Sequence, residues 1–339
     1  MKHRNNIRLL TGILGLIVLI FDGSTAITGM RRGMELCLYT LIPTLFPFCV
    51  LSMMITCITV GRRIRILEPI GRLFGIPKGT ESLLLVGWLG GYPVGAQNAA
   101  AAYRQGCLSR TDAQRLAVIC NNAGPSFLFG VLGPIIGDRK SLWILWGIQI
   151  LGSLLTARMI PSDKSENQSV PGVKYPSFPE ILRNASGSMV NICSCVIFFR
   201  MILEFLNRWI LWILPETVQI LVSGFLELSN GCILLASADQ CWVRFITASA
   251  LLSFGGICVW MQTMSVCSSL GIRNYLFWKS IQAIVCSCLA YACLHFSRMA
   301  SGVTCMPLII VFLTYILALI LKKGIAFSDA VLYNKKSAT

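Results

Sequence analysis

Charged residues are scarce in this chain of 339 residues, and acidic residues are scarcer than basic ones. Asp, Glu, Lys and Arg make up 13% of the sequence, with 14 acidic against 29 basic residues, whereas an ordinary soluble domain is about 25% charged. Apolar residues make up 55%, which is more than a soluble fold of this size can hide from water. This composition excludes a soluble enzyme, a disordered tail and a nucleic-acid-binding module. It predicts an all-α polytopic membrane protein.

Several chemical signatures are also absent. The sequence holds two histidines, His3 and His295, which excludes a histidine-based metal or catalytic centre. It has no P-loop, no G-x-S-x-G, no H-E-x-x-H and no C-x-x-C, so we expect no enzyme activity, no cofactor and no metal site. The 15 cysteines are odd in number and scattered through apolar segments, where we expect them to be small buried hydrophobic residues.

What the chain does have is a series of apolar segments separated by basic clusters. One long polar stretch, 161–183, contains four prolines and divides the series into two halves. The apolar segments are 9–29, 34–60, 81–102, 116–137, 141–160, 186–207, 215–238, 243–268, 280–297 and 303–321.

Two of these segments do not read as plain spanning helices. The first contains G-G-Y-P-V-G at 90–95, and the second contains E-L-S-N-G at 227–231. Glycine and proline interrupt a helix, and irregular backbone at membrane depth is tolerated only where protein or a water-filled cavity surrounds it. Both segments are therefore predicted to be re-entrant or broken hairpins.

The distribution of the basic residues predicts the membrane topology. With the N-terminus inside, about eight spanning helices and two hairpins that return to their own side, most Lys and Arg fall in cytoplasmic loops. The two halves then run in opposite directions, as an inverted repeat. G-W-L-G-G from residue 87 corresponds to G-F-L-E-L from 224, and N-N-A-G-P at 121–125 corresponds to S-F-G-G at 253–256. Inverted repeats with interrupted helices are the layout of many secondary transporters.

This topology divides the chain into five parts. Residues 1–30 read as a signal anchor, with a cleaved signal peptide as the alternative. The remaining parts are a first repeat at 31–160, a polar cytoplasmic linker at 161–183, a second repeat at 184–270, and a C-terminal helix pair with a tail at 271–339.

Polar residues and helix breaks inside apolar segments are the candidate substrate site. Glycines allow close backbone approach, and amides and hydroxyls supply hydrogen bonds at depth. Packing of kinked helices and hydrogen bonding between helices are the alternative explanations. Pro43, Pro47 and Pro125 are predicted structural breaks. The predicted substrate-binding residues are Gly91, Tyr92, Pro93, Gly95, Gln97, Asn98, Asn121, Asn122, Ser126, Arg200, Ser229 and Asn230.

Three of the charged residues within the apolar segments of the second half are candidates for function. Arg200 and Glu204 are four residues apart, so they can pair with each other on one helix. Alternatively, Arg200 offers its planar guanidinium to a substrate carboxylate while Glu204 holds it in place. Glu227, at the predicted hairpin tip, is a candidate proton-coupling site.

Three motifs together resemble a known family. P-T-L-F-P-F at 43–48, G-Y-P-V-G-A at 91–96 and N-x-x-G-P-x-F at 121–127 are similar to the sporulation integral membrane protein family of the YlbJ type, within the wider nucleoside-recognition, or Gate, superfamily. The resemblance covers roughly residues 30–320. It implies a role in stage V of endospore formation, in moving dipicolinic acid across the outer forespore membrane.

The resemblance also implies a ligand and partners. Dipicolinate is a flat aromatic dianion, which suits Arg200, a ring from Tyr92 or Phe127, and the nearby amides. A nucleoside or other solute carrier remains open, as does a non-transporting scaffold for spore development. The expected partners are the lipid bilayer and a small anionic substrate, with no nucleic acid; a homo-oligomer and other sporulation membrane proteins stay open as partners.

Overall fold

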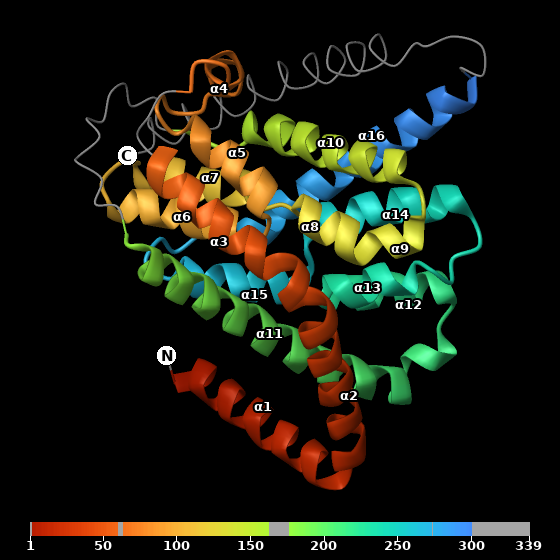
Figure 1. Cartoon of the computed structure of the whole chain (residues 1–339). Helices are drawn as coiled ribbons and strands as arrows, with labels where there is room; N and C mark the ends of the chain where they lie inside the picture. Colours follow the sequence, from red (N-terminus) through yellow and green to blue (C-terminus); the bar gives the residue numbers. More distant parts are fainter. Residues whose placement is uncertain (1, 60–63, 163–175, 273, 300–339) are drawn as a thin grey trace, which may run out of the picture.

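The computed structural model describes residues 2–59, 64–162, 176–272 and 274–299. Every regular element in these ranges is a helix (Figure 1). The all-α membrane class is confirmed, while the count of about eight spans stays a prediction and segment 303–321 lies outside the described residues. Five helical stretches in the described part are long and apolar enough to cross a membrane: Gly23–Thr56, Arg139–Ala157, Phe178–Trp209, Cys241–Val266 and Tyr275–Phe296.

The first half begins with two helices that form a V, whose apex projects from the rest of the protein (Figure 1). A π-helical turn at Cys37–Leu41 joins α2 to α3 without a loop, so the predicted boundary at 30/31 falls inside a helix. The helices are α1 (Lys2–Phe21), α2 (Gly23–Leu36), α3 (Ile42–Thr59), α4 (Glu68–Phe74), α5 (Glu81–Gly90), α6 (Val94–Arg104), α7 (Arg110–Ile119), α8 (Pro125–Phe127), α9 (Gly133–Ile136) and α10 (Arg139–Ala157).

The second half repeats the order of elements seen from α2–α3 to α10. A long helix is followed by two short helices, then by a helix broken in its middle, then by another long helix. Helix α4, between α3 and α5, has no counterpart in the second half, and the predicted inverted repeat stays a prediction. The helices are α11 (Phe178–Trp209), α12 (Glu216–Leu226), α13 (Leu228–Leu234), α14 (Cys241–Phe254), α15 (Gly256–Val266) and α16 (Tyr275–Met299).

The predicted interruptions are present, and two further segments are also broken. Segment 116–137 stops at Ile119 and resumes at the predicted break Pro125, which begins α8. Segment 243–268 stops at Phe254, and Gly255 adopts a φ of +84°, a conformation that favours glycine. The two breaks carry the corresponding motifs N-N-A-G-P and S-F-G-G.

In each half the interrupted helices pack directly on the break of the same half. A Cβ atom added to Gly91 would lie 2.7 Å from the Gly124 nitrogen, and one added to Gly95 would lie 1.9 Å from the Cys120 carbonyl oxygen. In the second half, a Cβ on Gly256 would lie 2.9 Å from the Gly224 carbonyl oxygen. Backbone therefore meets backbone at corresponding places, which explains why both motifs need glycine.

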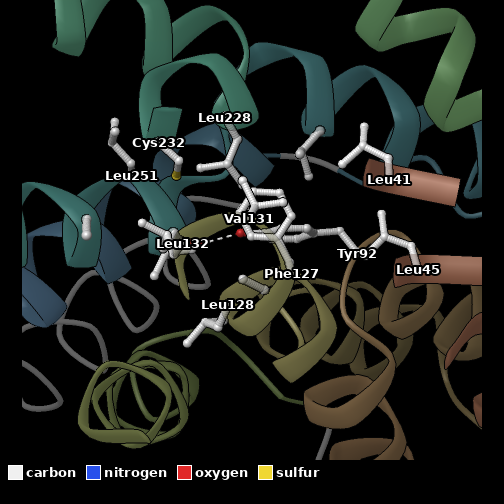
Figure 2. Packing of buried hydrophobic residues seen from close by; sticks show 14 of the residues in the cluster. Leu41, Leu45, Tyr92, Phe127, Leu128, Val131, Leu132, Leu228, Cys232 and Leu251 are labelled. Carbon is white, nitrogen blue, oxygen red and sulfur yellow. Dashed lines mark hydrogen bonds between the residues drawn. The ribbon is translucent and has the colours of Figure 1, made fainter. Parts of the chain in front are cut away.

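A mostly apolar core joins the two halves. Tyr92, between α5 and α6, is buried among Phe127, Val131 and Leu228 (Figure 2). Its hydroxyl donates a hydrogen bond of 2.5 Å to the carbonyl oxygen of Leu252 in the second half. The tip of the first interrupted pair thus contacts the broken helix of the other half.

Arg115 on α7 ties together the ends of two other helices. Its guanidinium donates to the carbonyl oxygens of Phe74 and Gly75 at the end of α4, and to that of Ala157, at 2.7 and 3.0 Å, at the end of α10. A cation is favourable at helix C-termini, where carbonyl groups lack partners. Burial lowers the pKa of Arg115 to about 10, so it stays charged at neutral pH.

Candidate functional site

Arg200 on α11 is the predicted anion-binding residue, and the structure leaves it available. Its side chain is partly buried, and its Nε atom is buried without a hydrogen-bond partner. Within the described ranges, the guanidinium forms no hydrogen bond and no ion pair. An unpartnered guanidinium in an apolar helix can bind a carboxylate through two parallel hydrogen bonds.

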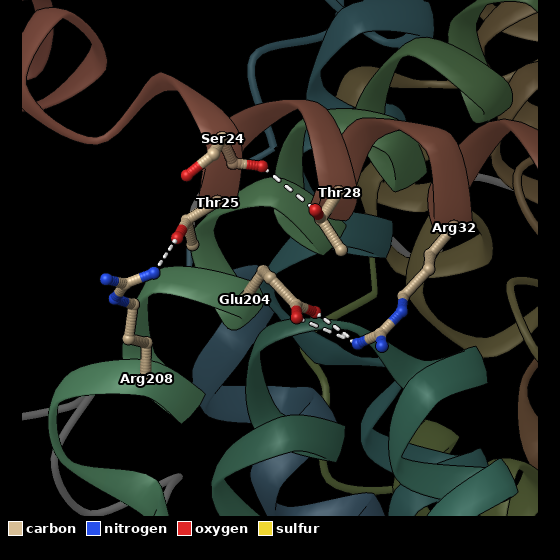
Figure 3. Close-up of polar contacts among 6 residues, drawn as sticks. All are labelled: Ser24, Thr25, Thr28, Arg32, Glu204 and Arg208. Carbon is tan, nitrogen blue, oxygen red and sulfur yellow. Dashed lines mark hydrogen bonds and ion pairs between the residues drawn. The ribbon is translucent and has the colours of Figure 1, made fainter.

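Glu204 does not pair with Arg200, although the two lie one turn apart. The Nη1 atom of Arg32 on α2 donates to both carboxylate oxygens of Glu204 at 2.8 Å (Figure 3). The physical reason is the close approach of α2 and α11: a Cβ on Gly29 would lie 2.7 Å from the Met201 Cα atom, and one on Gly33 would lie 2.8 Å from the Ile197 Cα atom. This contact brings Arg32 across to Glu204, because small residues four apart let helices approach.

An open cleft of about 410 Å³ lies beside this ion pair, between α2 and α11. Arg208 forms part of its wall, donates to the Thr25 hydroxyl at 3.0 Å (Figure 3) and pairs with Asp22 at 3.3 Å. The Thr25 hydroxyl and the charge of Arg208 hold the pKa of Asp22 below its usual value. The cleft is lined by Ser24, Thr25, Thr28, Glu204, Asn207 and Arg208. None but Glu204 was among the predicted site residues.

Glu227 lies at the break between α12 and α13, as the sequence predicted. Its carboxylate is fully buried and accepts hydrogen bonds from the backbone N–H groups of Ser229 at 2.8 Å and Asn230 at 2.7 Å. It therefore caps the N-terminus of α13. Arg200 and Glu227 influence each other electrostatically, and proton coupling by Glu227 stays a prediction.

Asn121 and Asn122 lie in the break between α7 and α8 and belong to a second polar cluster. The Asn121 amide donates to the Thr263 hydroxyl at 2.8 Å and to the Tyr275 hydroxyl at 2.7 Å. The Asn122 amide donates to the Ile119 carbonyl at 2.7 Å. Both asparagines are buried, so they connect the break of the first half to helices of the second.

Lys279 completes this second cluster and was missed by sequence reasoning. The apolar segment was placed at 280–297, which left Lys279 in a cytoplasmic loop; that assignment is wrong, because α16 begins at Tyr275 and buries Lys279 completely. The usable signal was the spacing of Tyr275, Lys279, Gln282 and Cys286, which lie on one face of a helix.

The structure places the other predicted residues as follows, and substrate binding by them stays a prediction. Gln97 on α6 accepts a hydrogen bond from Ser188 at 2.9 Å, and Asn98 donates to Thr56 at 2.9 Å. The Ser126 hydroxyl is buried without a partner in the described part of the chain. Pro43 and Pro47 lie within α3, and Pro125 lies at the start of α8. Gly91, Pro93 and Gly95 are buried next to Tyr92 in the chain, and the Tyr92–Pro93 peptide bond is cis.

Comparison with known proteins gives one informative similarity. No family model matches the chain, and no solved structure matches it. A protein of Bacillus subtilis (strain 168) described as sporulation integral membrane protein YlbJ is 26% identical to this chain over 288 residues, which cover 72% of this chain and 71% of that protein. The chain is thus similar to an integral membrane protein of sporulation, and this similarity supports the resemblance of its three motifs to that family.

Proposed function

We propose that this protein is a secondary carrier or facilitator that moves a small carboxylate, specifically dipicolinic acid, across the outer forespore membrane during sporulation. The observation that carries the proposal is the guanidinium of Arg200, whose Nε atom is buried without a hydrogen-bond partner in the described part of the chain. Membrane location rests on the apolar helices and on the similarity to a sporulation integral membrane protein.

The broken helices support transport over a purely structural role. Each half interrupts two of its segments, and the free ends meet backbone to backbone. Broken helices are costly in a bilayer unless their freed backbone groups are satisfied by protein, water or solute. Carriers use such ends to bind a solute near the middle of the membrane.

Arg200 supports an anionic solute over a neutral one. Burying a charged side chain inside the membrane costs free energy. An arginine without an acceptor therefore indicates a partner that binds reversibly. A carboxylate satisfies the planar donor face of a guanidinium, whereas a neutral nucleoside does not require one. The choice of dipicolinate among the small carboxylates comes from the resemblance to the sporulation family.

The test is transport by the purified protein in proteoliposomes. We expect saturable uptake of labelled dipicolinate, and a loss of about tenfold or more in Arg200→Ala, because a hydrogen bond to a charged group contributes roughly 1.5–3 kcal/mol. Arg200→Lys keeps the charge without the planar geometry and should retain an intermediate rate.

The matched control is Arg72→Ala. Arg72 is an exposed arginine of α4 whose partner is Glu68 at 2.7 Å, so its loss should leave uptake unchanged. Wild-type uptake by Arg200→Ala would contradict the role of Arg200. Uptake of uridine in place of dipicolinate would contradict the substrate, and absence of any solute flux would contradict transport itself.

A further inference from the structure

Lys279 is the most deeply buried charged side chain of α16, with none of its surface exposed. Its ammonium donates to the carbonyl oxygen of Asn121 at 2.9 Å, to Oδ1 of Asn122 at 3.2 Å and to Oε1 of Gln282 at 2.8 Å. An ammonium group has three N–H bonds. Three oxygens therefore use all of its donors.

None of these oxygens belongs to a carboxylate. Across the residues that the structure describes, the ion pairs are Arg32–Glu204, Arg72–Glu68 and Arg208–Asp22, and Lys279 takes part in none of them. A buried charge usually requires a counter-charge or a metal. Here the stabilisation comes from neutral dipoles alone.

The backbone adds to this stabilisation. Helix α7 ends at Ile119, and the Asn121 carbonyl follows directly after its last turn. The C-terminus of a helix carries a partial negative charge, which favours a cation. Oδ1 of Asn121 is also buried in this cluster and has no hydrogen-bond partner in the described part of the chain. The cluster is thus rich in oxygen and selects for positive charge.

The geometry argues against Lys279 as a binder of the solute. A residue that captures an anion must offer a free donor, as Nε of Arg200 does, and a surface that the anion can reach. Lys279 offers neither, since its three donors are occupied and its side chain is enclosed. Its surroundings instead match the groups that hold a coupling Na⁺ in carriers, namely unwound carbonyls at the C-terminal ends of half-helices.

We propose that the oxygens of Asn121, Asn122 and Gln282 form a monovalent-cation site, and that the ammonium of Lys279 occupies it in place of free Na⁺ or K⁺. The built-in cation fixes the break between α7 and α8 to α16. It follows that the native protein needs no free alkali cation here. This proposal does not depend on which solute is carried.

The test is to remove the built-in cation and supply a free one. Lys279→Ala leaves space among the oxygens, so we expect its thermal midpoint to fall in choline chloride and to rise by about 5 °C when choline is replaced by saturating NaCl or KCl at the same ionic strength. The native protein should show no difference between these salts. The midpoint is measured by heating membranes before solubilisation, which requires no solute transport.

The matched control is Lys279→Met, which fills the same space with an apolar chain and should not respond to Na⁺ or K⁺. An equal midpoint of Lys279→Ala in all salts, or an equal rise in Lys279→Met, would overturn the proposal. Because the cell interior is rich in K⁺, Lys279→Ala should also accumulate in membranes at least as well as Lys279→Met. Accumulation of the Met variant with loss of the Ala variant would overturn the proposal as well.

Discussion

Tyr92 and the carbonyl oxygen of Leu252 are joined by a hydrogen bond of 2.5 Å between the two halves of the protein. The Leu252 carbonyl is available because α14 ends at Phe254 and Gly255 turns the chain away. A carbonyl near a helix end lacks its intrahelical donor and needs another partner when it is buried. Tyr92 supplies that partner from the opposite half.

Tyr92→Phe should therefore destabilise the protein without changing its shape. The variant removes one hydroxyl and leaves a buried carbonyl without a donor, which costs roughly 1–3 kcal/mol. We expect a lower thermal midpoint for the purified protein. Tyr39→Phe is the control, because the side chain of Tyr39 is 80% exposed. Equal midpoints for both variants would show that the link between the halves contributes nothing.

The contact between α2 and α11 predicts that alanine has opposite effects at two helical glycines. Gly29→Ala should lower the thermal midpoint, because the new Cβ would meet the backbone of Met201 at 2.7 Å. A Cβ atom added to Gly15 in α1 would have no neighbouring atom within 4 Å. Gly15→Ala should therefore be neutral or stabilising, since alanine is favoured over glycine in a helix by about 1 kcal/mol. A stabilised Gly29→Ala protein would contradict the close packing.

Sequence reasoning reached the class of fold and the location of its interruptions. Glycine and proline in the motif around Tyr92 indicated a break because these residues disfavour a helix wherever they occur, and the structure breaks the chain there. Glu227 was predicted to lie at the tip of the second interruption, and the structure places it there, as the cap of α13, while proton coupling by Glu227 stays a prediction. The local sequence was sufficient to predict the positions of both interruptions.

Contacts between residues far apart in the chain could not be predicted from the sequence. Glu204 has Arg200 one turn away, yet it pairs with Arg32, which is 172 residues distant in the chain. Lys279 was assigned to a loop because a lysine beside an apolar segment usually marks its cytoplasmic end. Its burial depends on oxygens from the break at Asn121 and Asn122, and no local pattern brings those together with α16.

Asp138 provides a pH-dependent prediction outside the spans. Its carboxylate caps α10 by accepting from the backbone N–H groups of Lys140 at 3.1 Å and Ser141 at 3.0 Å. Hydrogen bonds from Ser141 and Lys140 hold the pKa of Asp138 below its usual value. A carboxyl with a lowered pKa contributes stability above its unfolded pKa, and this contribution is lost as the pH falls through its folded pKa.

Asp138→Ala should therefore lower the thermal midpoint at pH 7, and the difference from the native protein should shrink as the pH falls below the ordinary value for aspartate. Asp138→Asn is the control, because asparagine caps a helix comparably but does not ionise in this range. The thermal midpoint of Asp138→Asn should lie close to that of the native protein at neutral pH. A pH-independent effect of Asp138→Ala would contradict the ionic contribution to the cap.

Arg32 is expected to influence transport through Glu204. While Arg32 holds both oxygens of Glu204 at 2.8 Å, the carboxylate is kept away from Arg200. Arg32→Ala frees Glu204 to pair with Arg200, four residues earlier on the same helix face. Such a pair would neutralise the proposed anion site, so uptake in proteoliposomes should fall.

The double variant Arg32→Ala/Glu204→Gln distinguishes this explanation from simple loss of packing. It lacks the same arginine but has no carboxylate to capture Arg200, so uptake should return toward the native rate. A helix contact weakened by the loss of Arg32 would instead leave the double variant as slow as the single one. Equal uptake by the two variants would show that Glu204 does not compete with the substrate for Arg200, whereas restored uptake would place Arg200 in the path of the anion.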